Sequence, residues 1–192
     1  MDIAWLASAV GFALAMSATP GPNNAMVAAS AVNFGLRRSL PHMAGVSLGF
    51  PAMLVLVAVG AGEVLAASPG LQAALRWLGA AWMAWLASKI ATAAPPEAQG
   101  AARGRPMTFL QAALFQWVNP KAWVIAGAAI LAYGASPLLA AIFALAAFAS
   151  LYLWALVGLG AARLLRSPAA LRWFNRAMAA LLLLSLVPVL RG

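Results

Sequence analysis

Two short polar segments interrupt apolar stretches of the chain, and they hold the residues best suited to chemistry. The first segment, residues 19–24, reads Thr-Pro-Gly-Pro-Asn-Asn. Because each proline removes a backbone donor and clashes with the preceding turn, this segment must break a helix. In hydrocarbon, the released backbone groups are tolerated only where protein or a watery cavity surrounds them. We therefore expect a substrate or ion site formed by Thr19, Pro20, Gly21, Pro22, Asn23 and Asn24. The alternative is a kink that only shapes helix packing.

The second segment, residues 116–121, reads Gln-Trp-Val-Asn-Pro-Lys and again places a proline among polar residues. Lys121 lies about 12 residues into an apolar stretch, or about 18 Å along a helix axis, which is near the middle of a bilayer. A lysine at that depth costs at least a few kcal/mol, so it should face the bundle interior and serve a function. We expect the site to be completed by Gln116, Asn119, Pro120 and Lys121. The alternative is a shifted span from which the lysine snorkels to the surface.

The composition indicates what kind of element must position these residues. Hydrophobic residues make up 65% of the 192 residues and charged residues only 8%. A soluble domain carries roughly 45–50% apolar and about 25% charged residues. A bilayer core about 30 Å thick is crossed by a helix of roughly 20 apolar residues. The sequence therefore predicts an all-α membrane protein with about six transmembrane helices and short loops.

The apolar stretches divide into two sets of three. We expect spans over residues 4–30, 42–66, 71–91, 108–132, 137–162 and 173–190. The whole chain, 1–192, is then one polytopic domain whose linker, 92–107, separates half-repeats of about 1–91 and 108–192. With three spans per half, the second half enters from the opposite side, as in inverted-repeat transporters. Thr19-Pro20 lies 100 residues before Asn119-Pro120, and Gly35 lies 99 before Gly134. These spacings favour a 3+3 inverted repeat with broken helices 1 and 4.

Basic residues lie mainly on one side of the predicted spans. Nine of them fall on the odd-numbered connectors: Arg37, Arg38, Lys89, Arg103, Arg105, Arg163, Arg166, Arg172 and Arg176. The other side has two, Arg76 and Arg191. The positive-inside rule then places the odd connectors in the cytoplasm and both termini on the opposite side of the membrane. Because this rule explains the net charge of +9, we expect no nucleic-acid partner. The first apolar stretch lacks a preceding basic region and is interpreted as a span, not a signal peptide.

Residue types exclude several kinds of chemistry. The chain has no cysteine, a single histidine, His42, and three acids, Asp2, Glu63 and Glu97. We therefore expect neither a metal site nor a cofactor. An intramembrane enzyme would need a nucleophile–base pair, and its base would be His42, Lys121 or Glu63, with no serine near Lys121 in sequence. A structural membrane subunit, the other alternative, has no need for two helix breaks and a lysine in the membrane. We expect a transporter and not an enzyme.

Several motifs resemble the lysine-exporter/homoserine–threonine-resistance family (LysE/RhtB) over essentially the whole chain. They lie at residues 19–24, 35–39, 44–49, 79–90 and 116–121. The resemblance implies a bacterial inner-membrane secondary transporter that exports amino acids or close derivatives, driven by the proton gradient. Residues 79–90 and the Asn23-Asn24 ending look closest to the cysteine/O-acetylserine branch. The expected partners are a small amino-acid substrate and membrane lipid, with a homodimer left open.

A site between the two breaks would suit an amino acid. Half-helix N-termini carry partial positive charge and favour a carboxylate, to which Lys121 would add a full charge. Unwound carbonyl groups and the asparagine amides would hold the substrate ammonium group. Gly45 and Gly49 form a GxxxG pattern, which predicts a close helix–helix contact.

Overall fold

The computed structural model describes residues 2–93, 105–165 and 167–187, and all regular structure in these ranges is helical. In chain order the helices are α1 (Ile3–Ala18), α2 (Pro22–Phe34), α3 (Leu36–Leu56), the π-helix η1 (Val57–Ala61), α4 (Gly62–Ala66), α5 (Pro69–Ala91), α6 (Phe109–Val118), α7 (Pro120–Tyr133), α8 (Pro137–Leu164) and α9 (Pro168–Leu184). The predicted all-α class is confirmed. The linker 92–107 falls largely on residues 94–104, which lie outside the described ranges.

Both predicted helix breaks are present. Pro22 begins α2, a position where the missing N–H of proline costs nothing, and α1 and α2 are bent by 58° around residues 19–21. Asn119 is both the C-cap residue of α6 and the N-cap residue of α7, and its backbone angles are φ −88° and ψ 109°. Pro120 is the first residue of α7. The proline-containing segments therefore interrupt the helices where the sequence predicts.

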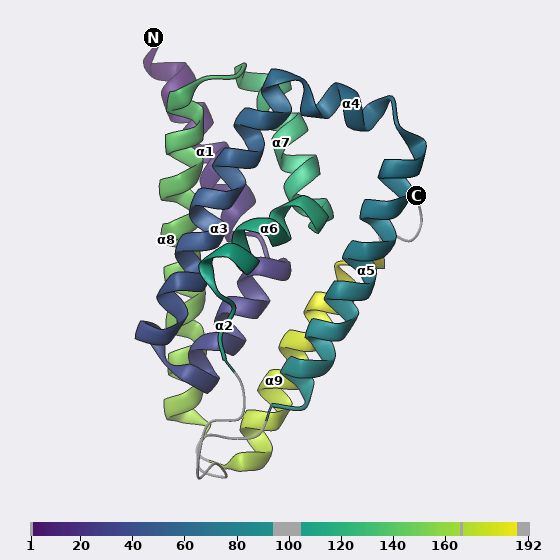
Figure 1. The fold of residues 1–192 in the computed structure, drawn as a ribbon. Helices are drawn as coiled ribbons and strands as arrows, with labels where there is room; N and C mark the ends of the chain where they lie inside the picture. The colour runs from purple at the N-terminus through teal and green to yellow at the C-terminus, as the bar shows by residue number, and fades with distance from the viewer. Residues whose placement is uncertain (1, 94–104, 166, 188–192) are drawn as a thin grey trace.

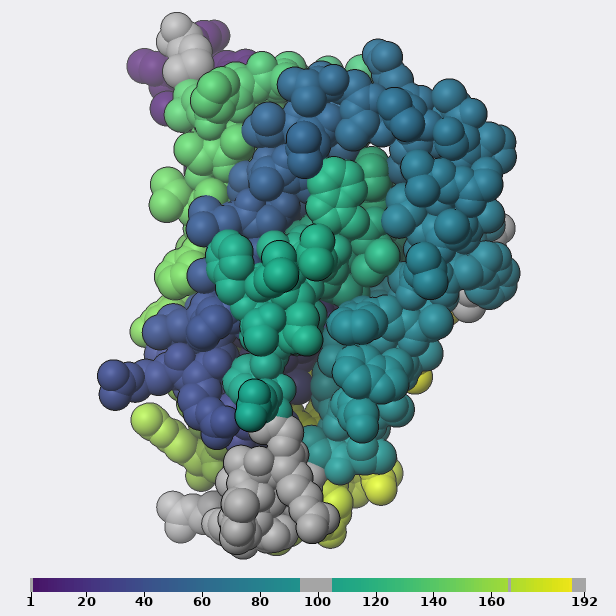
Figure 2. Space-filling view, viewed as in Figure 1, coloured from purple at the N-terminus to yellow at the C-terminus, as the bar shows by residue number. Residues whose placement is uncertain are grey.

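The long helix α8 runs along one side of the bundle and packs against α1, α2 and α3 (Figure 1). Helix α6 lies between α3 on one side and α5 on the other (Figure 2). Helices α5 and α9 pack along each other, and they touch the rest of the bundle through α2 and α6. Both helix breaks consequently lie inside the bundle, against α3 and α8.

Helices long and apolar enough to cross a membrane are fewer than predicted. Leu36–Ala66 and Pro137–Leu164 meet that description in the described ranges, and the bent pair α1–α2 adds a third. Helices α6 and α7 are apolar but short, with 10 and 14 residues. Helices α5 and α9 carry basic residues, which lower their apolar character. The structure thus shows a helical bundle with two or three spans by these criteria, and the six-span arrangement is not confirmed.

Several helix limits differ from the prediction, and the first predicted span, 4–30, extends to Phe34 at the end of α2. The second span begins at Leu36 and not at residue 42, because Gly35 ends α2 with φ 78° and α3 starts directly after it. The same span is interrupted by η1, where Gly60 adopts φ 116°. The last helix begins at Pro168 and not at residue 173, with the Ser167 hydroxyl accepting from the Ala170 N–H. These boundaries depend on caps that hydropathy does not detect.

Glycines allow several close helix crossings, and at Gly79 α5 packs on the backbone of α6 at Val118. A Cβ atom on Gly49 would lie 2.5 Å from Ala113 Cα, and one on Gly45 would meet the Phe109 carbonyl, so α3 packs directly on the backbone of α6. The close contact predicted from GxxxG is confirmed. At Gly158, α8 approaches the backbone of Ala28 in α2 in the same way.

Candidate functional site

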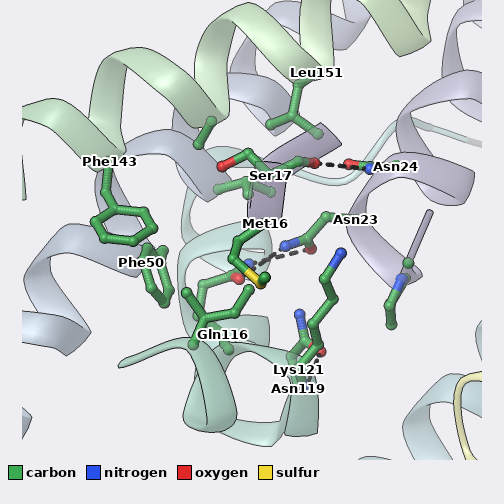
Figure 3. A pocket seen from close by; sticks show the side chains of 16 residues that line it. Met16, Ser17, Asn23, Asn24, Phe50, Gln116, Asn119, Lys121, Phe143 and Leu151 are labelled. Carbon is green, nitrogen blue, oxygen red and sulfur yellow. Dashed lines mark hydrogen bonds between the residues drawn. The ribbon is translucent and has the colours of Figure 1, made fainter. Parts of the chain in front are cut away.

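A cavity lies where the two helix breaks meet (Figure 3). Its lining residues are Met16, Ser17, Gly21, Pro22, Asn23, Asn24, Val46, Phe50, Gln116, Asn119, Lys121, Ala122, Ile125, Phe143, Ala147 and Leu151. The space open to the centres of water-sized molecules is about 50 Å³, which is room for a few waters. A bound solute of amino-acid size would therefore need a wider cavity.

Most residues of the predicted site are brought together here. Those that line the cavity are Gly21, Pro22, Asn23, Asn24, Gln116, Asn119 and Lys121. Thr19 contributes through its carbonyl oxygen, which accepts a hydrogen bond from Lys121 Nζ. Pro20 and Pro120 do not line the cavity and belong to the two helix breaks. Two segments about 100 residues apart in the sequence thus form one polar surface.

A reciprocal amide pair joins the two breaks. Asn23 Nδ2 donates to Gln116 Oε1 at 2.9 Å, and Gln116 Nε2 donates to Asn23 Oδ1 at 3.3 Å. Gln116 is fully buried and its Nε2 also donates to the Ala112 carbonyl at 2.8 Å. This pair holds α2 and α6 at a fixed distance on one side of the cavity.

The carbonyl groups released at the end of α1 are already paired with protein donors. Asn24 Nδ2 donates to the carbonyls of Ser17 at 2.9 Å and Thr19 at 3.0 Å. From α8, Ser150 donates to the Ser17 carbonyl at 2.8 Å, and Trp154 Nε1 to that of Ala18 at 3.3 Å. These carbonyls are therefore already hydrogen-bonded within the protein, and their binding of a substrate ammonium group stays a prediction. Buried backbone groups need partners, and α8 and Asn24 supply them.

The two helix N-termini at the cavity differ in their caps. At α7, the Asn119 side chain accepts from the Lys121 N–H at 3.2 Å, and Trp123 Nε1 donates to the released Trp117 carbonyl at 2.8 Å. At α2, the N-cap residue is Gly21, which offers no side-chain cap. The α2 N-terminus thus keeps its partial positive charge available to an anion.

Lys121 lies directly against that N-terminus. Its Nζ donates to the Thr19 carbonyl at 2.5 Å, and a Cβ atom on Gly21 would lie 2.9 Å from Lys121 Cδ. None of the cavity-lining residues is acidic, and Glu63 is exposed on α4. The lining therefore has a single formal charge, which is positive.

Apolar side chains that the sequence did not single out form the opposite wall. They come from α1, α3 and α8 and are Met16, Phe50, Phe143 and Leu151 (Figure 3). The two phenylalanine rings meet edge to face, with their centroids 5.2 Å apart. These residues look like ordinary membrane-helix residues in the sequence. Only the packing of the long helices against the breaks brings them to the cavity.

The chain belongs to the LysE type translocator family, whose sequence profile matches residues 14–189. Among similar proteins is the cysteine/O-acetylserine efflux protein of Salmonella typhimurium, 39% identical over 110 residues. The protein of the same name in Escherichia coli K12 is 36% identical over 110 residues. Each alignment covers 57% of this chain and 55% of the relative, so the match spans about half the length of these relatives. No solved structure matches. The family resemblance noted from the motifs is confirmed.

Proposed function

We propose that this protein is a secondary transporter that exports small neutral amino acids or close derivatives across the bacterial inner membrane. The observation that carries the proposal is the cavity between two helix breaks, with one lysine and no acid in its lining. Membership in a translocator family supports a transporter over the two alternatives, an intramembrane enzyme and a structural subunit.

The substrate carboxylate binds between Lys121 and the uncapped N-terminus of α2. A carboxylate there gains an ammonium partner and the partial positive charge of the helix end. The Asn23–Gln116 pair supplies the polar contacts for the substrate ammonium group, since amide oxygens are good acceptors once the pair opens. Thr19, Pro20, Asn24, Asn119 and Pro120 act by shaping the two breaks.

Charge balance favours a neutral amino acid. A zwitterion brings one carboxylate to neutralise Lys121, whereas a substrate with a basic side chain adds a positive charge that no lining residue compensates. Uncompensated charge in a poorly hydrated site is expensive. The apolar wall formed by Met16, Phe50 and Phe143 suits a small, weakly polar side chain. Two relatives named for efflux of cysteine and O-acetylserine agree with this size and charge.

We further propose that the two halves form an inverted repeat. Gly35 and Gly134 end the broken helices with nearly the same backbone angles, φ 78° and ψ 169° against φ 71° and ψ 167°. Ser68-Pro69 begins α5 and Ser167-Pro168 begins α9, again 99 residues apart. The pair α1–α2 also runs in the opposite direction to α6–α7 (Figure 1). This arrangement is typical of alternating-access transporters.

The orientation in the membrane follows from the charged end of the bundle. The end of α2, the start of α3, the end of α5, the end of α8 and the start of α9 lie together, and we call this the basic end (Figure 1). It carries Arg37, Arg38, Lys89, Arg105, Arg163, Arg172 and Arg176, while Arg103 and Arg166 lie outside the described residues. We place the basic end in the cytoplasm and both termini in the periplasm. Alkaline phosphatase fused at Gly192 should be active, and fused at Gly100 it should be silent.

Proton coupling is assigned to Lys121. Its ammonium group is the one charged group of the cavity lining, and it would bind the carboxylate in its protonated form. Loss of its proton when the carboxylate leaves would link substrate release to proton movement.

The deciding experiment measures efflux from proteoliposomes loaded with serine, cysteine or O-acetylserine under an imposed pH gradient, with lysine as the matched charged solute. We expect efflux of the neutral solutes and none of lysine above the protein-free background. Equal efflux of lysine would overturn the selectivity argument, and no efflux of any amino acid would overturn the proposed function.

A further inference from the structure

A second polar pair lies further along α2, at the basic end. Asn33 Nδ2 donates to Asn175 Oδ1 at 3.1 Å, and Asn175 Nδ2 donates to Asn33 Oδ1 at 3.2 Å. Asn33 also donates to the Ala29 carbonyl, which fixes its rotamer. Asn175 is 1% exposed. Ten residues of α2 separate this pair from Asn23, so it lies about 15 Å from the cavity along the helix axis. We call it the asparagine pair.

The asparagine pair lies at the basic end of a larger apolar interface, in which Ala25, Met26, Ala28 and Ala29 of α2 pack with residues of α5 and α9. Next to it, Val32, Ala161 and Leu171 form a small apolar cluster between α2, α8 and α9. Helices α5 and α9 reach the rest of the bundle mainly through α2 and α6. In the described residues, α7 makes no comparable contact with α5 or α9. The α5–α9 body therefore packs along α2 and, at Gly79, against the backbone of α6, and it is separate from α7 towards the other end (Figure 1).

The proposed repeat allows the asparagine pair to be compared with the equivalent positions of the other half. With the 99-residue offset set by Gly35 and Gly134, Asn33 corresponds to Ala132 in α7, and Asn175 corresponds to Arg76 in α5. Ala132 has no side chain that could form such a bond, and Arg76 is exposed. A state with α7 packed on α5 would therefore have no counterpart of the asparagine pair.

We propose that the asparagine pair is the latch of a gate at the basic end. The structure is the state closed at that end, and transport requires the α5–α9 body to separate from α2 there and approach α7 at the opposite end. Asn33 and Asn175 hold the closed state through two hydrogen bonds that the alternate state lacks. This inference rests on the proposed transport function, since a gate is needed only by a protein that passes a solute.

Cysteine labelling tests the latch without any knowledge of the substrate. Because the chain has no cysteine, Ala147→Cys provides a single reporter thiol on the cavity wall. Its rate of reaction with a membrane-impermeant methanethiosulfonate reagent, added to the basic side, measures opening of the basic end. Two interhelical hydrogen bonds in a membrane protein correspond to roughly a five- to tenfold shift between two states. Asn175→Ala and Asn33→Ala should each raise the labelling rate by about that factor.

Ser30→Ala is the matched control. It removes the Ser30–Ser39 hydroxyl bond of 2.8 Å at the same end of α2, but that bond joins α2 to α3 and not to α9. We expect its labelling rate to stay at that of the parent. Unchanged labelling in both asparagine variants would overturn the latch, as would an equal increase in Ser30→Ala.

Cross-linking provides the second test. In the variant Asn33→Cys with Asn175→Cys, a short, reducible bis-methanethiosulfonate should stop efflux of serine, and a reductant should restore it. A linked protein that exports at the normal rate would show that α2 and α9 need not separate. If no amino acid is exported by the parent protein, the proposed function fails, while the labelling result still decides whether the basic end opens.

Discussion

Replacing Asn24 by aspartate tests how the first helix break is held. Asn24 is 4% exposed, and its amide nitrogen donates to the carbonyls of Ser17 and Thr19 at 2.9 and 3.0 Å. Asn24→Asp keeps the shape of the side chain but replaces the donor by an oxygen. In its ionised form, the carboxylate would face two carbonyl oxygens and donate nothing.

The expected cost follows from these contacts. Each lost hydrogen bond contributes about 0.5–1.5 kcal/mol to the free energy of unfolding, so two contribute about 1–3 kcal/mol. Both carbonyls keep a second donor, Ser150 for Ser17 and Lys121 for Thr19. The free-energy cost of the lost bonds therefore lies in the lower half of that range. Repulsion between the carboxylate and the carbonyls adds to it. For a chain of this length, the melting temperature should fall by roughly 3–8 °C.

The pH dependence separates this explanation from simple misfolding. Because a protonated carboxyl group can donate one hydrogen bond, the melting temperature of Asn24→Asp relative to the parent should rise as the pH falls from 8 to 5. Asn24→Ala loses the same bonds at every pH and should show no such recovery. Thermal unfolding in detergent, with serine efflux measured in parallel, would check both variants. An Asn24→Asp variant as stable as the parent at pH 8 would refute the role assigned to Asn24.

Substitutions at three further positions address the cavity and the packing. Lys121→Gln should abolish efflux. Lys121→Arg should retain binding but lose coupling to an imposed pH gradient, because a guanidinium group effectively never deprotonates. Normal, pH-dependent efflux by Lys121→Gln would show that the substrate site lies elsewhere. Gly21→Ala should displace the Lys121 side chain, since its Cβ would lie 2.9 Å from Cδ, and lower efflux about tenfold or more with little change in melting temperature. Gly49→Ala should cost about 1–3 kcal/mol of stability, because its Cβ would meet the Ala113 backbone, while Gly127→Ala, with nothing within 4 Å, should not.

Local sequence chemistry was sufficient to predict the two helix breaks. Proline acts on the turn in which it occurs, and at Pro20, Pro22 and Pro120 it coincides with polar neighbours and a break. Pro41 and Pro51 lie inside the continuous helix α3, so proline alone does not mark a break. The cost of a lysine in hydrocarbon similarly points Lys121 towards the interior. The meeting of these segments in one cavity followed from treating them as equivalent positions of two halves.

Contacts supplied by unbroken helices were beyond such reasoning. Ser150 and Trp154 lie in α8, a long helix with no break, and their role depends on which face of α8 meets the end of α1. The interruption at η1 was also missed, because glycines at 60 and 62 are common in membrane helices and their backbone angles depend on the neighbouring packing. The number of membrane spans could not be predicted for the same physical reason. Helices α6 and α7 are each too short to cross a membrane, and the angle between them determines whether the pair crosses it.

The capping of α1 by α8 has a consequence for biogenesis. The carbonyls of Ser17 and Ala18 receive donors that lie 133 and 136 residues later in the chain. At about 5–20 residues per second, a ribosome needs roughly 7–27 s to synthesise that interval. During this time the first helix break enters the membrane without the two α8 donors, and the Ser17 carbonyl has only its local partner, Asn24. The nascent first half must therefore wait beside water, lipid headgroups or the insertion machinery, and it reaches its final hydrogen bonding only after α8 has been inserted.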